Sequence, residues 1–134
     1  MILADSSVWI DYFNGRISPE TDTLDRLLGQ QLILAGDLIL TEVLQGFRRE
    51  KDYRIALELF EAIEIGNLAG RDIALQAAQN YRALRAKEIT PRKTIDMIIG
   101  TYCIVHEHPL LHADRDFDVL ETELGLRTLQ CREL

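Results

Sequence analysis

Short apolar runs that lead directly into helical patterns constrain the fold of this chain more than any other feature. Three such runs occur, at 1–4, 32–35 and 110–112. They are too short for helices and are typical of buried strands. Because strands that alternate with helices build parallel sheets, the sequence predicts an α/β domain. Its mainly parallel central sheet should be covered by helices on both faces, in a three-layer α/β/α arrangement.

The helices are predicted from apolar residues at helical spacing and from capping residues. Ser6 or Ser7 is expected to cap a helix that runs through Phe13, and Pro19 stands at the first helical position after Ser18. Further helices are predicted at 19–29, 40–47, 52–63, 71–87, 95–103 and 118–124, and a last edge strand at 127–129.

Length and composition predict one domain that spans residues 1–134. A chain of this length buries about two-thirds of its unfolded surface, so it needs no structural metal or disulfide. Cys103 and Cys131 are therefore expected to be reduced thiols. The amino terminus has neither a basic segment before its apolar run nor a membrane-spanning stretch, which predicts a cytoplasmic protein without a membrane partner.

Charge is distributed unevenly along the chain. The net charge of −7 argues against broad electrostatic binding to nucleic acid. Residues 82–93 nevertheless hold five basic residues and one acidic residue, a local charge of +4. This run is either a solvated helix face or a surface that follows phosphates, and the sequence leaves both interpretations open.

Acidic residues stand where the predicted strands end. Asp5 ends the first strand, Asp114 and Asp116 follow the strand at 110–112, and Glu42 lies about one turn into the helix after the second strand. Asp96 borders the apolar face of the helix at 95–103. Ligands of open parallel sheets bind at the carboxyl ends of the strands, so these carboxylates are expected to meet there.

Clustered carboxylates predict a metal site. Each close pair repels by a few kcal/mol at an effective dielectric of about 20, and a hard divalent cation removes that cost. Mg²⁺, with Mn²⁺ as a second candidate, prefers oxygen ligands and suits phosphate chemistry through a metal-activated water. Taken singly, each acid could instead cap a helix or complement its dipole.

Four motifs together resemble PIN-domain ribonucleases, specifically the VapC-type toxins of toxin–antitoxin pairs. They are ILADSSVWIDYF at 2–13, LTEVLQGF at 40–47, TIDMIIGTYC at 94–103 and LLHADRDFDVL at 110–120. The resemblance covers essentially the whole chain. It implies a metal-dependent endoribonuclease that cleaves RNA, forms a homodimer and is inhibited by a small antitoxin whose tail enters the active-site groove.

The resemblance also implies roles for individual residues. Catalysis and metal binding are expected from Asp5, Glu42, Asp96 and Asp114, with Asp116 as an accessory metal ligand or as an acid that positions a water. Ser6 or Ser7 matches a hydroxyl that the family keeps beside the first acid, and both are expected near substrate. His112 departs from the family pattern, which has Thr two residues before the fourth acid. As a hypothesis from charge, the RNA backbone is guided by Arg85, Lys87, Arg92 and Lys93.

Two alternatives from other functional classes fit the same coarse pattern. A Mg²⁺-binding phosphoacceptor module also carries acids at this sheet edge, but it usually has paired acids after the first strand and a late Lys, which this sequence lacks. A catalytically silent interaction domain would use the acids only at helix ends. Trp9, Tyr12 and Phe13 are expected in the core or at an interface rather than in base stacking, and His106, His108 and His112 in a surface turn.

Overall fold

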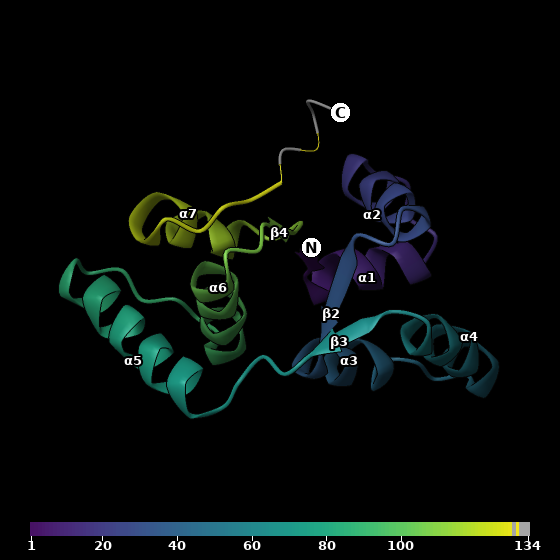
Figure 1. The fold of residues 1–134 in the computed structure, drawn as a ribbon, viewed down its shortest axis with the longest axis horizontal. Coiled ribbons are helices and arrows are strands. Elements are labelled where there is room, and N and C mark those ends of the chain that lie inside the picture. The colour runs from purple at the N-terminus through teal and green to yellow at the C-terminus, as the bar shows by residue number, and fades with distance from the viewer. Residues whose placement is uncertain (130, 132–134) are drawn as a thin grey trace.

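A four-stranded sheet in which all strands run parallel lies at the centre of the molecule (Figure 1). The computed structural model describes residues 1–129 and 131. The strands are β1 (Ile2–Ala4), β2 (Ile33–Gly36), β3 (Glu64–Gly66) and β4 (Leu110–Leu111), and their spatial order is β3-β2-β1-β4. Because β1 is central, the residue that follows it lies in the middle of the carboxyl edge.

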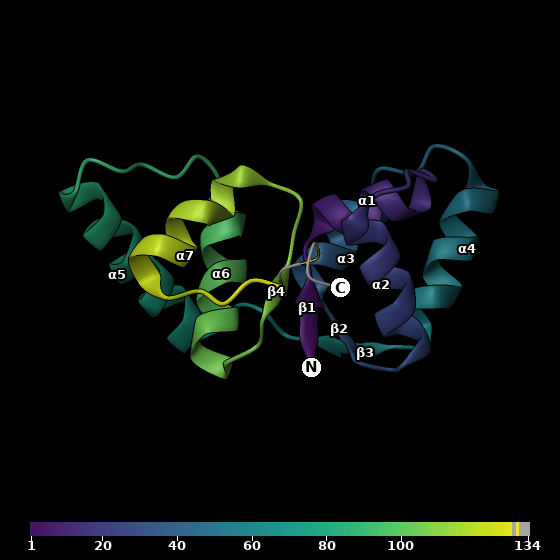
Figure 2. The same ribbon diagram turned by 90° about the horizontal axis from the view of Figure 1, so that it is seen from above.

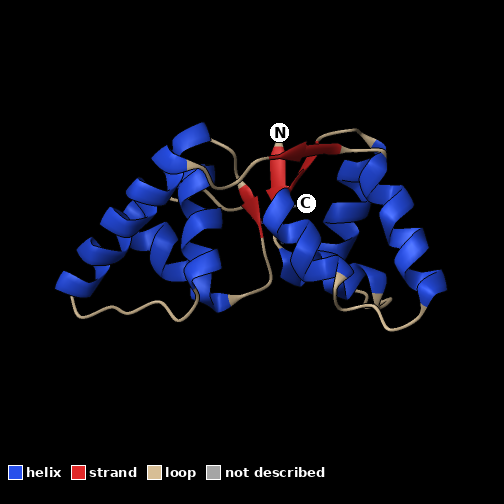
Figure 3. Cartoon of the chain, turned by 90° about the horizontal axis from the view of Figure 1, so that it is seen from below, coloured by secondary structure: helices blue, strands red, loops and turns tan. Residues whose placement is uncertain are grey.

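Helices cover both faces of the sheet. One layer contains α1 (Ser6–Phe13), α2 (Pro19–Gly29), α3 (Asp37–Leu44) and α4 (Glu50–Glu61). The other contains α5 (Arg71–Ala86), α6 (Thr94–His106), the 3₁₀ turn η1 (Arg115–Phe117) and α7 (Asp118–Leu124). Figure 2 shows these two groups on opposite sides of the strands, and Figure 3 shows the strands as a thin layer between them. The structure confirms the predicted three-layer α/β/α fold.

The strands that precede the acids agree with the predicted apolar runs within one residue at each end. Two other strands differ from the prediction. β3 was not expected, because it is an edge strand that carries the exposed Glu64 and Ile65 instead of an apolar run. The predicted strand at 127–129 is present as a single bridge between Leu110 and Thr128, with backbone hydrogen bonds on either side of it.

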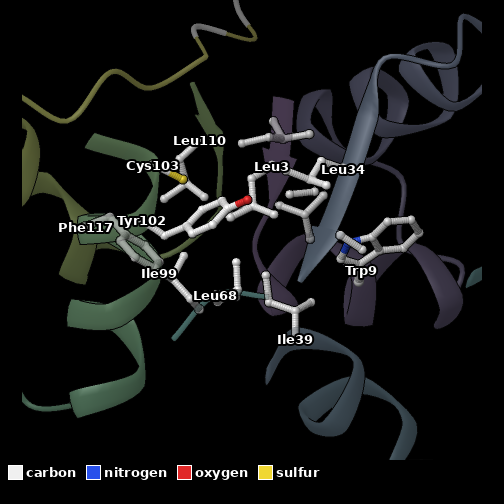
Figure 4. Close-up of a cluster of buried hydrophobic side chains, with 14 of the residues drawn as sticks. Leu3, Trp9, Leu34, Ile39, Leu68, Ile99, Tyr102, Cys103, Leu110 and Phe117 are labelled. Carbon is white, nitrogen blue, oxygen red and sulfur yellow. The ribbon is translucent and has the colours of Figure 1, made fainter. Parts of the chain in front are cut away.

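The core lies on both faces of the sheet. Leu3, Leu34 and Leu110 come from three neighbouring strands and are at most 4% exposed (Figure 4). Trp9 is fully buried, stacks on Phe13 and also contacts the ring of Phe60. Burial removes Trp9 from any role in base stacking, in agreement with the expectation of a core position. Cys103 and Cys131 are both free thiols.

The capping of α1 differs from the sequence prediction in one respect that matters for the site. The N-cap is Asp5, whose carboxylate accepts from the backbone N–H of Ser7, and Ser6 is already helical. Ser18 caps α2 as expected, and the adjacent Pro19 opens the helix. None of the helices among the described residues is both long and apolar enough to cross a membrane.

Candidate metal centre

The structure gathers the predicted carboxylates at the carboxyl edge of the sheet, although they come from four separate segments. Asp5 follows β1, Asp114 follows β4, Glu42 lies on α3 and Asp96 lies in the first turn of α6. One oxygen each from Asp96, Asp114 and Asp116 can be chosen so that all three lie within 4.8 Å of one another. The charges of Asp5, Asp114 and Glu42 each raise the pKa of Asp96, so these acids lie close enough to interact.

Ser7 holds Asp5 in place. Its backbone N–H and its hydroxyl both donate to Asp5 Oδ2, at 3.1 and 2.7 Å. The Ser7 Oγ also accepts from the backbone N–H of Ala113 at 3.2 Å, so it connects the end of β1 to the segment after β4. Burial raises the pKa of Asp5, the Ser7 hydrogen bonds lower it, and the nearby Glu42 raises it further.

Ser6 holds the second acid. Its hydroxyl donates to Glu42 Oε1 at 2.7 Å and joins the start of α1 to α3. Ser6 is buried and Glu42 is partly exposed, so the carboxylate has one oxygen fixed by the protein and a side open to solvent. Ser6 and Ser7, which the sequence left as alternatives, therefore have different roles. Ser7 fixes Asp5, and Ser6 fixes Glu42.

The segment after β4 is held by its own side chains. Asp114 caps η1, and its Oδ1 accepts from the backbone N–H of Asp116 at 2.9 Å. His112 Nδ1 accepts from the backbone N–H of Asp114 at 3.3 Å, and its ring contacts Phe117. At this position the imidazole thus supports the backbone of the acidic segment.

Asp96 is a nearly buried carboxylate whose charged form is unfavourable in its surroundings. It is 8% exposed, and its Oδ2 is buried without a hydrogen-bond partner among the described residues. Burial first, then the charge of Asp5, raises its pKa to about 7, with Lys93 acting in the opposite direction. A buried carboxylate oxygen without a donor, surrounded by other carboxylates, fits a bound divalent cation, because oxygen ligands of this kind are those that Mg²⁺ and Mn²⁺ take.

The four basic residues that were predicted to guide the RNA backbone separate into two pairs. Arg92 Nη2 contacts both oxygens of Asp116, at 3.1 and 3.3 Å, and Lys93 Nζ lies 3.8 Å from Asp114 Oδ2. The other pair lies away from the acids: Lys87 binds Glu123 at 3.0 Å, and the Arg85 guanidinium lies over the ring of Tyr81. The structure thus brings two of the four to the acidic cluster.

A polar groove of about 500 Å³ opens beside the acids. It lies between the ends of α1 and α2 and the segment after β4, with Asp114, His112, Arg16 and Arg115 in its lining. The sequence alone indicated no role for either arginine. The position of Arg115 between Asp114 and Asp116 could have indicated that it lies at the site. Arg16 follows α1 in a turn without a motif, so nothing in the sequence indicated its position.

Comparison with known proteins agrees with this architecture. The family model described as PIN domain matches residues 2–122. The VapC ribonuclease Mb1587 of Mycobacterium bovis and the ribonuclease VapC11 of Mycobacterium tuberculosis are each 29% identical over 134 residues, covering 98% of this chain and 100% of the relative. The match therefore extends along the whole length of both relatives.

Solved structures show the same fold. VapBC2 from Rickettsia felis, bound to a DNA fragment from its promoter, contains a chain that superposes with a TM-score of 0.71 at 16% identity, covering 96% of this chain and 98% of that one. FitAcB from Neisseria gonorrhoeae contains a chain with a TM-score of 0.65 at 18% identity, and both chains are covered completely.

Proposed function

We propose, because the chain belongs to the PIN-domain family, that residues 1–134 act as one PIN-like nuclease domain, a metal-dependent endoribonuclease that serves as the toxin of a toxin–antitoxin pair. The observation that carries the proposal is the buried, unpartnered Asp96 Oδ2 inside a cluster of carboxylates. The names of the relatives that match along the whole chain support the ribonuclease activity.

The metal would be held by Asp5, Glu42, Asp96 and Asp114, with Asp116 as an accessory ligand. Mg²⁺ is the proposed ion and Mn²⁺ its substitute, because both prefer hard oxygen ligands. A bound ion of this kind lowers the pKa of a coordinated water and stabilises negative charge that develops on a phosphodiester. The role of Ser7 is to fix the orientation of the first acid, and Ser6 does the same for Glu42.

Arg92 and Lys93 would contact the RNA backbone. Each is already within ion-pair distance of a cluster carboxylate, so a phosphate bound at the acids is within reach of both side chains. Their pairing with Asp116 and Asp114 also offsets acidic charge while no ion is bound. Arg85 and Lys87 contact Tyr81 and Glu123 instead of the cluster carboxylates, so they would act on another part of the strand.

An antitoxin and a second copy of the chain are proposed as protein partners. VapBC2 and FitAcB, whose chains share this fold, support the antitoxin. The polar groove beside the acids, with Arg16 and Arg115 in its lining, offers a place for an inhibitory tail. We also propose a homodimer, on the ground of the family resemblance, and a cytoplasmic location, on the ground of the reduced thiols.

A cleavage assay tests the proposal. A pool of mixed, structured RNA is incubated with purified, antitoxin-free protein in Mg²⁺, in Mn²⁺ and in chelator, beside the variants Asp96→Asn and Asp72→Asn. Asp72 is an exposed carboxylate in the first turn of α5 and serves as the matched control. We expect discrete, metal-dependent products from the wild type and the control, and none from Asp96→Asn. Folded protein that cuts no RNA in either metal would instead support the silent interaction domain.

A further inference from the structure

An apolar groove of about 500 Å³ lies between α5 and α6, outside the carboxylate site. Both helices belong to the same layer and lie side by side in Figures 1 and 2. The groove is lined mainly by carbon, from small residues of α5 and larger apolar residues of α6, including Ala74, Ala78, Tyr81, Met97 and Ile98. Nothing in the proposed metal chemistry uses this surface.

Small side chains create the groove. Ala74, Ala77 and Ala78 recur on the face of α5 that meets α6, where larger residues would fill the space. Tyr81, which is half-buried, lines the groove between these alanines and Arg85. The Arg85 guanidinium carbon lies 5.7 Å from the centre of the Tyr81 ring. An aromatic ring beside a guanidinium is a surface on which nucleobases stack.

The groove and the carboxylate site share the first turn of α6. Thr94 and Met97 line the groove from this turn, and Asp96 lies on another face of the same turn. The loop that joins the two helices carries Arg92 and Lys93 to the acids. A strand whose phosphate lies at the acids can therefore follow this loop toward the groove.

We propose that the α5–α6 groove binds bases of the single-stranded RNA substrate on one side of the cleaved phosphodiester, with one base stacked on Tyr81 and with Arg82 and Arg85 on the backbone. This inference rests on the proposed ribonuclease function. Charge complementarity favours RNA as the occupant, because Arg82 and Arg85 line the groove and attract the phosphates of a strand whose bases enter it.

Binding of RNA to full-length protein tests the groove directly. The probe is a mixed-sequence, fluorescently labelled single-stranded RNA, with Ca²⁺ in place of Mg²⁺ and gel analysis to verify that the strand stays intact. Loss of one stacking contact weakens binding by about tenfold or more, which we expect for Tyr81→Leu, while Tyr81→Phe keeps the ring and the affinity. Ala78→Leu fills the groove without a change of charge and should weaken binding to a similar degree.

The salt dependence of RNA binding tests the role of Arg85 separately from that of the groove. Arg85→Gln should flatten the slope of log affinity against log salt by about 0.7, the value for one phosphate contact on a single strand. Arg71→Gln removes the same charge from the opposite end of α5 and is the matched control, with an expected slope close to that of the wild type. Equal slopes for the two variants would contradict the backbone role of Arg85.

Two further outcomes would overturn the proposal. RNA affinity that is unchanged in both Tyr81→Leu and Ala78→Leu would show that no base enters the groove. A change from dimer to monomer in these variants, measured by sedimentation, with RNA affinity per subunit retained, would assign the groove to a second copy of the chain. Metal-dependent cleavage by the wild type is measured in parallel, so that failure of the ribonuclease proposal is seen separately from failure of the groove.

Discussion

Replacement of Asp96 by Asn should stabilise the metal-free protein. The Asp96 carboxylate is almost fully buried, lies among other carboxylates and has one oxygen without a donor, so its ionised form is unfavourable in the folded state. Asn has the same shape and no charge. The substitution therefore removes repulsion at the site while it leaves the packing of α6 in place.

The magnitude follows from the pKa. A rise from 3.8 to about 7 corresponds to about 4 kcal/mol at full ionisation. Water and dissolved ions reach the other acids and screen part of this repulsion, so we expect about 2 kcal/mol. Because the pKa of Asp96 is raised on folding, this cost is absent below about pH 4, grows as the pH rises, and is complete above about pH 7.

Urea unfolding in chelator measures the difference. At pH 8 the free energy of unfolding of Asp96→Asn should exceed that of the wild type by about 2 kcal/mol, and at pH 4 by less than about 1 kcal/mol. Saturating Mg²⁺ should reverse the order, since the ion stabilises only the form that binds it. Asp72→Asn, at the exposed start of α5, should instead lower stability by about 0.3–1 kcal/mol, because it removes a favourable charge from a helix N-terminus. A metal-free Asp96→Asn protein less stable than the wild type at pH 8 would refute the reasoning.

Three further substitutions test other parts of the structure. Arg92→Gln removes the ion pair with Asp116 and should raise Mn²⁺ affinity about two- to fivefold in calorimetric titrations at low salt. Ser7→Ala breaks two side-chain hydrogen bonds at the sheet edge and should lower thermal stability by about 1–2 kcal/mol. Gly100→Ala places a methyl group 2.2 Å from Leu120 Cδ2, so urea unfolding should show a loss of about 1–3 kcal/mol, against the usual gain for Ala in a helix.

The strands that position the acids could be predicted from the sequence because each is a compact apolar run with an acid soon after it. β3 could not, because its residues Glu64 and Ile65 are exposed at the edge of the sheet, and edge strands do not need two apolar faces. Its place depends on pairing with Ala35 and Gly36 of β2, which is a tertiary interaction that the local pattern does not contain.

The sequence also could not show that the basic residues between 82 and 93 lie on two different surfaces. A count of charges between 82 and 93 treats the segment as one surface, but α5 ends at Ala86 and the chain then turns toward α6. That turn takes Arg92 and Lys93 to the acids and leaves Arg85 beside Tyr81. The sequence likewise could not show that one oxygen of Asp96 lacks a partner, because helical periodicity placed the residue only at the border of the core.

The central position of β1 has a consequence for the timing of folding. β1 pairs on one side with β4, through Leu3 with Leu110 and Ala4 with Leu111, across most of the 134-residue chain. Contacts between segments so distant in sequence form late, since the loop-closure entropy must be lost before they stabilise the chain. A ribosome-bound nascent chain that still lacks β4 carries Asp5, Glu42 and Asp96 but has no Asp114 to place beside them. The order of synthesis therefore delays the complete set of carboxylates until β4 and the segment that follows it have been made.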